Sequence, residues 1–187
     1  MDQSADLLTK GRSSPLLDAL DERIAAHAEE AFTFLERLIA ADSTVGREQS
    51  ALEIVASELD GLGFEIERLS IPEAIADVPG AGVPLLPYDG RYDVIGRRAG
   101  DIDGTSVLLN GHIDVVPAEE PQLWTSPPFE PARRDGWLFG RGAGDMKCGF
   151  AMGVLALRAL LDPAVGAELG PLTLSLIHIS EPTRQTI

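Results

Sequence analysis

The hydrophobic and polar residues predict two helices in the first third of the chain. Ser14 followed by Pro15 is typical of a helix start, with serine as the N-cap and proline in the first turn. Apolar residues then recur at helical spacing, which predicts a long helix with one face packed on a sheet. A second helix is expected at about residues 47–62, ended by Gly63. The apolar face of the first helix comprises Leu16, Leu20, Ile24, Ala28, Phe32, Leu35, Leu38 and Ile39, and His27 is expected to be a solvated side chain on that helix.

Shorter apolar runs predict strands in the rest of the chain. Residues 64–69 and 92–97 are strand candidates, and the apolar run at 107–109 predicts a buried strand. A short strand at 137–139 leads through closely spaced glycines into a helix that begins near residue 146. Proline and glycine make residues 71–90 a long irregular insertion. This order predicts an α/β sandwich with its functional site on loops at the carboxyl ends of the strands.

Candidate chemistry begins where the strand at 107–109 ends, in the sequence NGHIDVVP (110–117). Side chains two apart on a strand point to the same face, so His112 and Asp114 can leave the strand together. A metal-bound imidazole usually donates its second ring nitrogen to a carboxylate or carbonyl, which fixes its tautomer. His112 is therefore a candidate ligand and Asp114 its neighbour, although His-x-Asp taken alone is common by chance.

A second candidate is Asp145, on the glycine-punctuated turn before the last predicted helix. A carboxylate at that place has two interpretations. It can be a metal ligand, or it can be an N-cap that accepts from free N–H groups and meets the positive end of the helix dipole. Asp145 alone favours the cap, whereas its occurrence together with His112 and Asp114 favours a metal site.

Several motifs in a fixed order resemble a known family. They are GHIDVVP (111–117), PFEP (128–131) after Trp124, DGWLFGRG (135–142) and DMK (145–147), preceded by DSTVG (42–46) and LGFEIE (62–67). Over about residues 16–173 the chain resembles the zinc metallopeptidases and amidohydrolases of the family of acetylornithine deacetylase, succinyl-diaminopimelate desuccinylase, aminoacylase and glutamate carboxypeptidase. The resemblance implies a three-layer α/β sandwich with a mixed sheet, a zinc-exopeptidase-like catalytic domain of which this chain is the amino-terminal part. Cys148 stands where many members carry glycine.

The resemblance also implies roles for the candidate residues. His112 would ligate one zinc, Asp145 would bridge two, and Asp114 would be the catalytic residue that orients the His112 ring. The bond from Asp145 to Met146 would be a cis peptide. Two zinc ions, for which cobalt can substitute, would polarise a scissile carbonyl and activate a shared water. The implied activity is hydrolysis of an amide bond in an N-acyl amino acid or small peptide, as in acetylornithine deacetylase.

The family's proton-transfer base is the first of two adjacent glutamates beyond the next strand, and nothing here matches it. Residues 172–173 begin a plausible strand, but the string LSLIHISEPTR (174–184) resembles the conceptual translation of a transposase-type sequencing adapter. The alternative is a genuine strand followed by a polar tail. On the first interpretation His178 and Glu181 are false ligands.

These observations predict how the chain is divided. We expect a flexible N-terminus at 1–14, a partial catalytic domain at 15–173 and a non-native tail at 174–187. The family's inserted dimerisation domain, through which the parent would form a homodimer, would be absent. This fragment would itself be inactive.

Composition narrows the function classes. With 44% hydrophobic residues and a formal net charge of -15, the chain is typical of a globular protein that does not bind nucleic acid or an anionic membrane. The single cysteine, Cys148, excludes an internal disulfide and suits a reducing compartment. Residues 1–14 do not form a targeting segment, so we expect a cytoplasmic protein.

Two alternatives come from other classes. Glycines between a strand and a helix occur in nucleotide- or phosphate-binding modules, but the spacing here fits neither the dinucleotide nor the Walker pattern. Asp145 would also repel phosphate. A non-catalytic protein built on the hydrolase fold is the other alternative, and the presence of His112, Asp114 and Asp145 argues against it.

Overall fold

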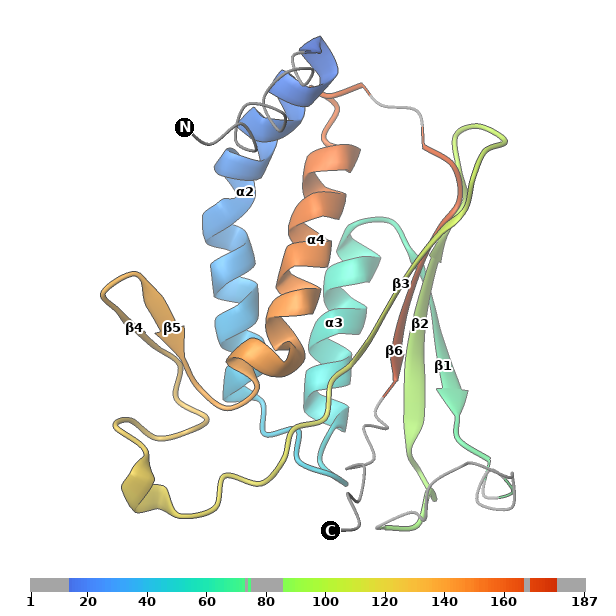
Figure 1. The fold of residues 1–187 in the computed structure, drawn as a ribbon. Helices are drawn as coiled ribbons and strands as arrows, with labels where there is room; N and C mark the ends of the chain where they lie inside the picture. Colours follow the sequence, from blue (N-terminus) through green and yellow to red (C-terminus); the bar gives the residue numbers. More distant parts are fainter. Residues whose placement is uncertain (1–13, 73, 75–85, 167–168, 178–187) are drawn as a thin grey trace, which may run out of the picture.

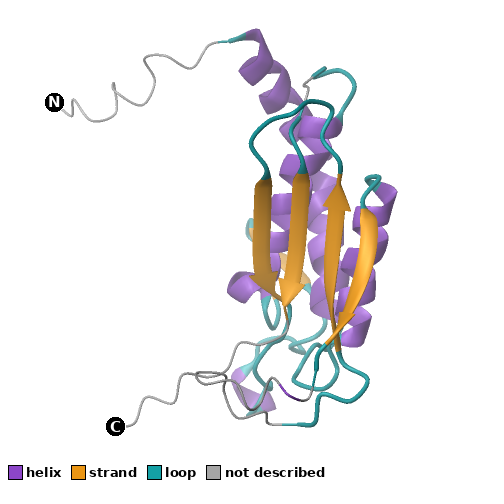
Figure 2. Cartoon of the chain, turned by 90° about the vertical axis from the view of Figure 1, so that its right-hand side faces the viewer, coloured by secondary structure: helices purple, strands orange, loops and turns teal. Residues whose placement is uncertain are grey.

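A computed structural model describes residues 14–72, 74, 86–166 and 169–177. These residues form a layer of three helices packed on one face of a sheet, as Figures 1 and 2 show from two sides. The expectations for residues 1–13, for most of the insertion at 71–90, and for His178 and Glu181 lie outside the described residues.

The three helices are α2 Pro15–Ala40, α3 Gln49–Gly61 and α4 Cys148–Leu161. Ser14 is the N-cap of α2 as predicted, and its hydroxyl accepts a hydrogen bond from the Leu17 N–H at 3.3 Å. The predicted apolar face of α2 is only partly right, because Ile24 and Phe32 are 39% and 48% exposed. The first turns of α2 extend past the end of the sheet (Figure 2), whereas Phe32 lies in the second half of the helix, under the guanidinium of Arg133 at 5.1 Å from the ring centroid. The buried residues come from its second half and are Ala31, Phe34, Leu35, Leu38 and Ile39.

Four strands form a mixed sheet in the order β1-β2-β6-β3. β2 is antiparallel to both β1 and β6, whereas β3 and β6 are parallel. A separate antiparallel pair, β4 and β5, forms a short hairpin beside the helices (Figure 1). The strands are β1 Glu65–Ser70, β2 Tyr92–Arg98, β3 Val107–His112, β4 Ala132–Arg134, β5 Trp137–Phe139 and β6 Leu172–Ile177.

The prediction that β3 is a buried strand is wrong. Its residues Val107, Leu108 and Leu109 are 47%, 64% and 37% exposed. The reason is topological, since β3 is an edge strand of the described sheet and the helices cover one face only (Figure 2). An apolar run is thus compatible with an edge strand, which sequence alone does not distinguish from a central one.

β6 lies in the middle of the sheet and includes the first residues of the predicted tail. Leu174 is opposite Gly96 of β2 and Leu109 of β3, and it is 2% exposed. Residues 174–176 therefore pair on both sides as part of a central strand, and residue 177 pairs with β3. The non-native origin of residues 174–187 stays a prediction.

The core lies between the helix layer and the sheet. Leu38, Leu59, Val94 and Val154 from four different elements are all 0% exposed, and each such aliphatic side chain contributes roughly 1.5–3 kcal/mol by leaving water. This packing fixes α4 between α2 and α3 in the helix layer, as Figure 1 shows. As a consequence, the carboxyl end of β3 lies beside the turn that precedes α4.

His27 is not simply solvated, contrary to the prediction. It lies 3.3 Å from a carboxylate oxygen of Glu30 on the same helix and 3.3 Å from one of Asp162, the residue after α4. Its side chain is half-buried because these two groups cover both ring nitrogens. The imidazole thus links α2 to the end of α4.

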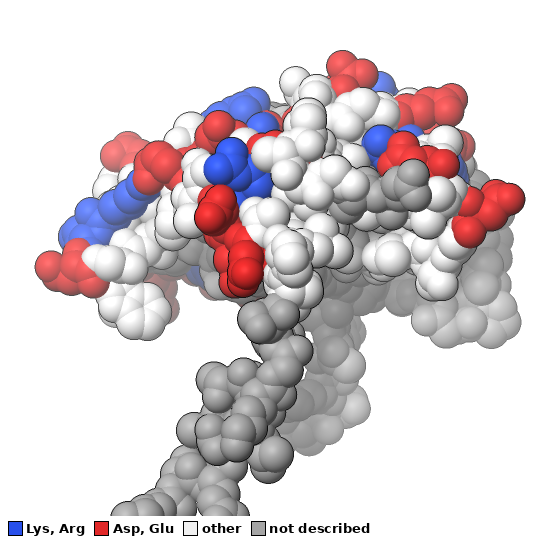
Figure 3. Space-filling model, turned by 90° about the horizontal axis from the view of Figure 1, so that it is seen from above, with Lys and Arg blue, Asp and Glu red and all other residues white. Residues whose placement is uncertain are grey.

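Acidic and basic side chains are interspersed on the face drawn in Figure 3. Ion pairs also join different elements of the fold, such as Arg158 with Glu58 and Arg133 with Glu36. Because charges of both signs are mixed on the face drawn in Figure 3, that face has no continuous basic surface that would bind a phosphate backbone. In the described parts of the chain, every helix is too short or too polar to cross a membrane.

Candidate metal centre

His112 is the last residue of β3, and its ring is held from one side. Its Nδ1 atom lies 3.2 Å from Asp114 Oδ1 and 3.2 Å from the Asp114 backbone oxygen. Asp114 is only 3% exposed. The segment that follows β3 is fixed to the loop after α2, because the Ser43 hydroxyl donates to the Ile113 carbonyl at 2.8 Å and the Val115 N–H donates to the Ser43 carbonyl at 3.0 Å. The predicted pairing of His112 with Asp114 is therefore present.

Asp145 faces the other ring nitrogen. Its Oδ1 atom lies 3.2 Å from His112 Nε2, although the two residues are 33 positions apart in sequence. The bond from Asp145 to Met146 is cis, as the family resemblance implied. Asp145 belongs to the kinked turn Ala143–Lys147 and is almost fully exposed, with a side-chain exposure of 91%.

The cap interpretation of Asp145 is wrong. The N-cap of α4 is Lys147, two residues later, and α4 has no side-chain cap hydrogen bond. Asp145 and Met146 have non-helical backbone angles, with φ and ψ of -126° and 101° at Asp145. This extended backbone turns the carboxylate towards His112 rather than towards the free N–H groups of the helix.

The two donor atoms fit a metal ion. Zinc lies about 2.0–2.1 Å from imidazole nitrogen and about 2.0–2.2 Å from carboxylate oxygen. Two donors 3.2 Å apart could both lie within those distances of one ion. Because Asp114 occupies Nδ1, His112 would ligate through Nε2. Among the residues that the structure describes, no group of three or more His, Cys, Asp and Glu side chains is arranged to hold a metal.

A pocket of about 250 Å³ lies between the segment after β3 and the turn before α4. Its polar lining includes His112, Asp114, Asp145 and Arg141. The Arg141 guanidinium lies over the Trp124 ring, 4.8 Å from the centroid, and the Arg141 N–H donates to the Pro128 carbonyl at 2.6 Å. These contacts join the loop of residues 140–147 to the long connection after β3.

Lys147 is the residue that sequence reasoning missed. It was recognised only as part of the DMK motif, yet it is 0% exposed, and its ammonium donates to the backbone carbonyls of Leu38 at 2.6 Å and Ala41 at 3.0 Å. Burial lowers the pKa of Lys147 from 10.5 to about 8, and the nearby carboxylate of Asp42 opposes part of that change. The position of Lys147 directly before a strongly apolar helix could have indicated its burial, because a buried charge needs hydrogen-bond partners.

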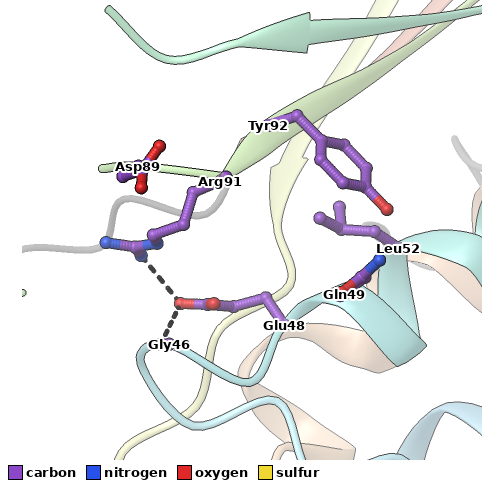
Figure 4. A pocket seen from close by; sticks show the side chains of 8 residues that line it. Gly46, Glu48, Gln49, Leu52, Asp89, Arg91 and Tyr92 are labelled. Atoms are coloured by element: carbon purple, nitrogen blue, oxygen red, sulfur yellow. Dashed lines mark hydrogen bonds and ion pairs between the residues drawn. The ribbon is translucent and has the colours of Figure 1, made fainter. Parts of the chain in front are cut away.

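A second pocket, of about 230 Å³, lies at the starts of α3 and β2 and contains none of the predicted site residues (Figure 4). Across it, Arg91 and Glu48 point toward one another and form an ion pair of 2.8 Å. Glu48 also accepts from the Gly46 N–H at 2.9 Å. Both charged side chains are largely buried, so we interpret this pair as a tie between the two elements.

Comparison with known proteins gives matches in both sequence and structure. Residues 108–180 match the pattern of peptidase family M20/M25/M40. A succinyl-diaminopimelate desuccinylase from Paracidovorax citrulli is 34% identical over 134 residues, which cover 70% of this chain and 32% of that protein. The chain thus spans about a third of the length of the curated relatives it matches.

Solved structures of two dipeptidases share the fold. The di-peptidase Dug1p of Saccharomyces cerevisiae has a TM-score of 0.68 at 21% identity, with 88% of this chain and 34% of that chain covered. Human carnosine dipeptidase 1 has a TM-score of 0.66 at 22% identity, with 94% and 37% covered. These likenesses confirm the predicted α/β fold with a mixed sheet. This chain corresponds to part of the matched structures.

Proposed function

We propose that this chain, which belongs to peptidase family M20/M25/M40, is the amino-terminal part of the catalytic domain of a two-metal hydrolase. The observation that carries the proposal is the placement of His112 between two carboxylates, with Asp114 on Nδ1 and Asp145 on Nε2. A metal-ligating histidine usually donates its second ring N–H to a carboxylate, a carbonyl or a water, and the buried Asp114 carboxylate fits that partner while Asp145 is exposed beside Nε2.

The described residues have separable tasks in this proposal. Asp114 accepts from Nδ1 and so keeps Nε2 free of its proton and directed at the metal. Asp145, which is exposed to the pocket, supplies an oxygen donor that two ions can share. Divalent ions, when bound, polarise the scissile carbonyl and lower the pKa of a bound water. Residues 140–144 line the same pocket of about 250 Å³ beside these donors.

The substrate class that we propose is an N-acyl amino acid or a small peptide, cleaved at an amide bond. Family membership supports it, since the named relatives include a succinyl-diaminopimelate desuccinylase, and dipeptidases share the fold. Within that class we propose an acetylornithine deacetylase-like activity with zinc as the metal. Two carboxylates, Asp114 and Asp145, line the pocket against one guanidinium, Arg141, and this balance favours a cation over a phosphate ligand.

Zinc binding by this chain and three variants tests the site. With two donors instead of the usual three or four, the chain should bind zinc weakly in competition with a chromophoric chelator. His112→Ala should abolish that binding, and Asp145→Asn should do nearly the same because a neutral amide bridges cations poorly. Asp114→Asn should lose less, about 10- to 100-fold. Asp135→Asn, an exposed acid in the turn between β4 and β5, is the control for overall charge.

The outcomes separate a site from non-specific attraction to an acidic chain. Zinc binding that falls equally in all variants, Asp135→Asn included, would show that the ion responds to net charge alone. Unchanged binding in Asp145→Asn would remove this carboxylate from the site. Activity is a separate measurement, made as metal-dependent release of amino acid from N-acyl amino acids or dipeptides by the product of the full reading frame.

A further inference from the structure

Lys147 joins the loop that carries Asp145 to the last turn of α2. The ammonium is buried and donates to the carbonyls of Leu38 and Ala41, both at the carboxyl end of that helix. Carbonyls in a last helical turn lack partners within the helix and form the negative end of its dipole, so a cation is favourable there. The lysine thereby satisfies groups that are more than a hundred residues away from it in sequence.

The same residue also closes the loop on the other side of Asp145. The Lys147 N–H donates to the Gly142 carbonyl at 3.0 Å, and the aliphatic part of its side chain lies against Gly142. Residues 143–146 are therefore spanned by one backbone bond whose donor residue is itself tied to α2. The Asp145 side chain has less support, since it is 91% exposed and its polar contact is with His112 Nε2 at 3.2 Å.

We propose that Lys147 is a positioning residue that holds the Asp145 carboxylate opposite His112 Nε2 by anchoring its loop to the end of α2. The expected effect on zinc binding rests on the proposed function. The expected effect on the position of Asp145 relative to His112 does not require a metal. A residue with a merely structural role would change stability. Substitution of a positioning residue would also change the geometry at His112 in a chain that is still folded.

The test compares Lys147→Met, which keeps the aliphatic stem and removes the donors, with Val154→Ala, which destabilises the core of the same helix away from the loop. Val154 is 0% exposed. The unfolding free energies of both variants are measured in urea, so that variants with a similar loss of stability are compared. The ring nitrogens of His112 are then followed by ¹H–¹⁵N NMR in the metal-free chain, and zinc affinity is measured by chelator competition. Lys147→Gln, which keeps one short donor, carries the same test if Lys147→Met fails to fold.

The expected result is a change in the His112 ring signals and a loss of zinc affinity of about tenfold or more in Lys147→Met, with both properties unchanged in Val154→Ala. Ring signals in Lys147→Met that match those of Val154→Ala at equal stability would overturn the proposal. If the unsubstituted chain binds no zinc that His112→Ala removes, the proposed metal site fails instead, and the metal-free ring signals still decide the role of Lys147.

Discussion

Gly142→Ala should destabilise the loop before α4 through both strain and overlap. Gly142 has a φ of +78°, a conformation that costs an L-residue roughly 1–2 kcal/mol. A Cβ atom added there would lie 2.5 Å from Val115 Cγ1 and 3.2 Å from Lys147 Cδ. Both neighbours are buried and held by other contacts, so neither can move without a further cost of about 1–3 kcal/mol.

The chain contains a matched control for the strain. Gly136, in the turn between β4 and β5, has a φ of +79° and nothing within 4 Å of an added Cβ. Gly136→Ala should therefore show the backbone cost alone, roughly 1–2 kcal/mol, whereas Gly142→Ala should lose roughly 2–5 kcal/mol. The difference between the variants measures how tightly the loop packs on the segment after β3.

Equilibrium unfolding in urea, followed by far-ultraviolet circular dichroism, provides the comparison. Losses that agree within error would mean that Val115 and Lys147 yield freely, and the close packing of this loop would be refuted. A smaller loss in Gly142→Ala than in Gly136→Ala would contradict the strain argument as well.

Two further predictions concern charged pairs on the surface. The pKa of Glu53 is held at about 2, against an ordinary value of 4.5, first by hydrogen bonds from Arg68 and also by the Tyr92 hydroxyl. Because the folded pKa is the lower one, this carboxylate stabilises the fold above pH 4.5 and loses that effect as pH falls towards 2. The difference in unfolding free energy between the unsubstituted chain and Glu53→Gln should therefore shrink from pH 4.5 to 2. A difference that stays constant over this range would contradict the prediction. Arg133→Gln removes exposed ion pairs to Glu36 and Glu29. Its urea midpoint should fall slightly at low salt and match that of the unsubstituted chain at high salt. A loss of stability that does not depend on salt would instead point to the packing of Arg133 on the Phe32 ring.

Periodicity and motifs predicted the elements that depend on local sequence. The Ser14-Pro15 start of α2, the extent of α3 and the strands β1, β2 and β5 follow from capping and from apolar spacing, and the structure confirms them. These elements depend on a few neighbouring residues, whose identities the sequence states directly. The meeting of His112 with Asp145 was implied by the family resemblance and not by local sequence, because the two residues are 33 positions apart.

The errors concern properties that depend on distant partners. β3 is exposed because of its edge position, which is set by the order of strands rather than by the residues 107–109. His27 is covered because α4 ends beside it. The cap interpretation of Asp145 failed because Asp145 and Met146 both have non-helical backbone angles and α4 begins only after them, and the backbone angles of such a turn are not evident from composition.

The candidate centre is held together by anchors on both sides of Asp145 rather than by the side chain itself. Before it, the Arg141 N–H bonds to the connection after β3 and Gly142 packs on Val115. After it, Lys147 bonds to the end of α2. A carboxylate that is 91% exposed gains little from packing, so its place opposite His112 must come from the backbone. Two of these anchors bind the connection after β3 and the third binds the end of α2, which is why two short motifs can form one site only after the helices and the sheet have packed.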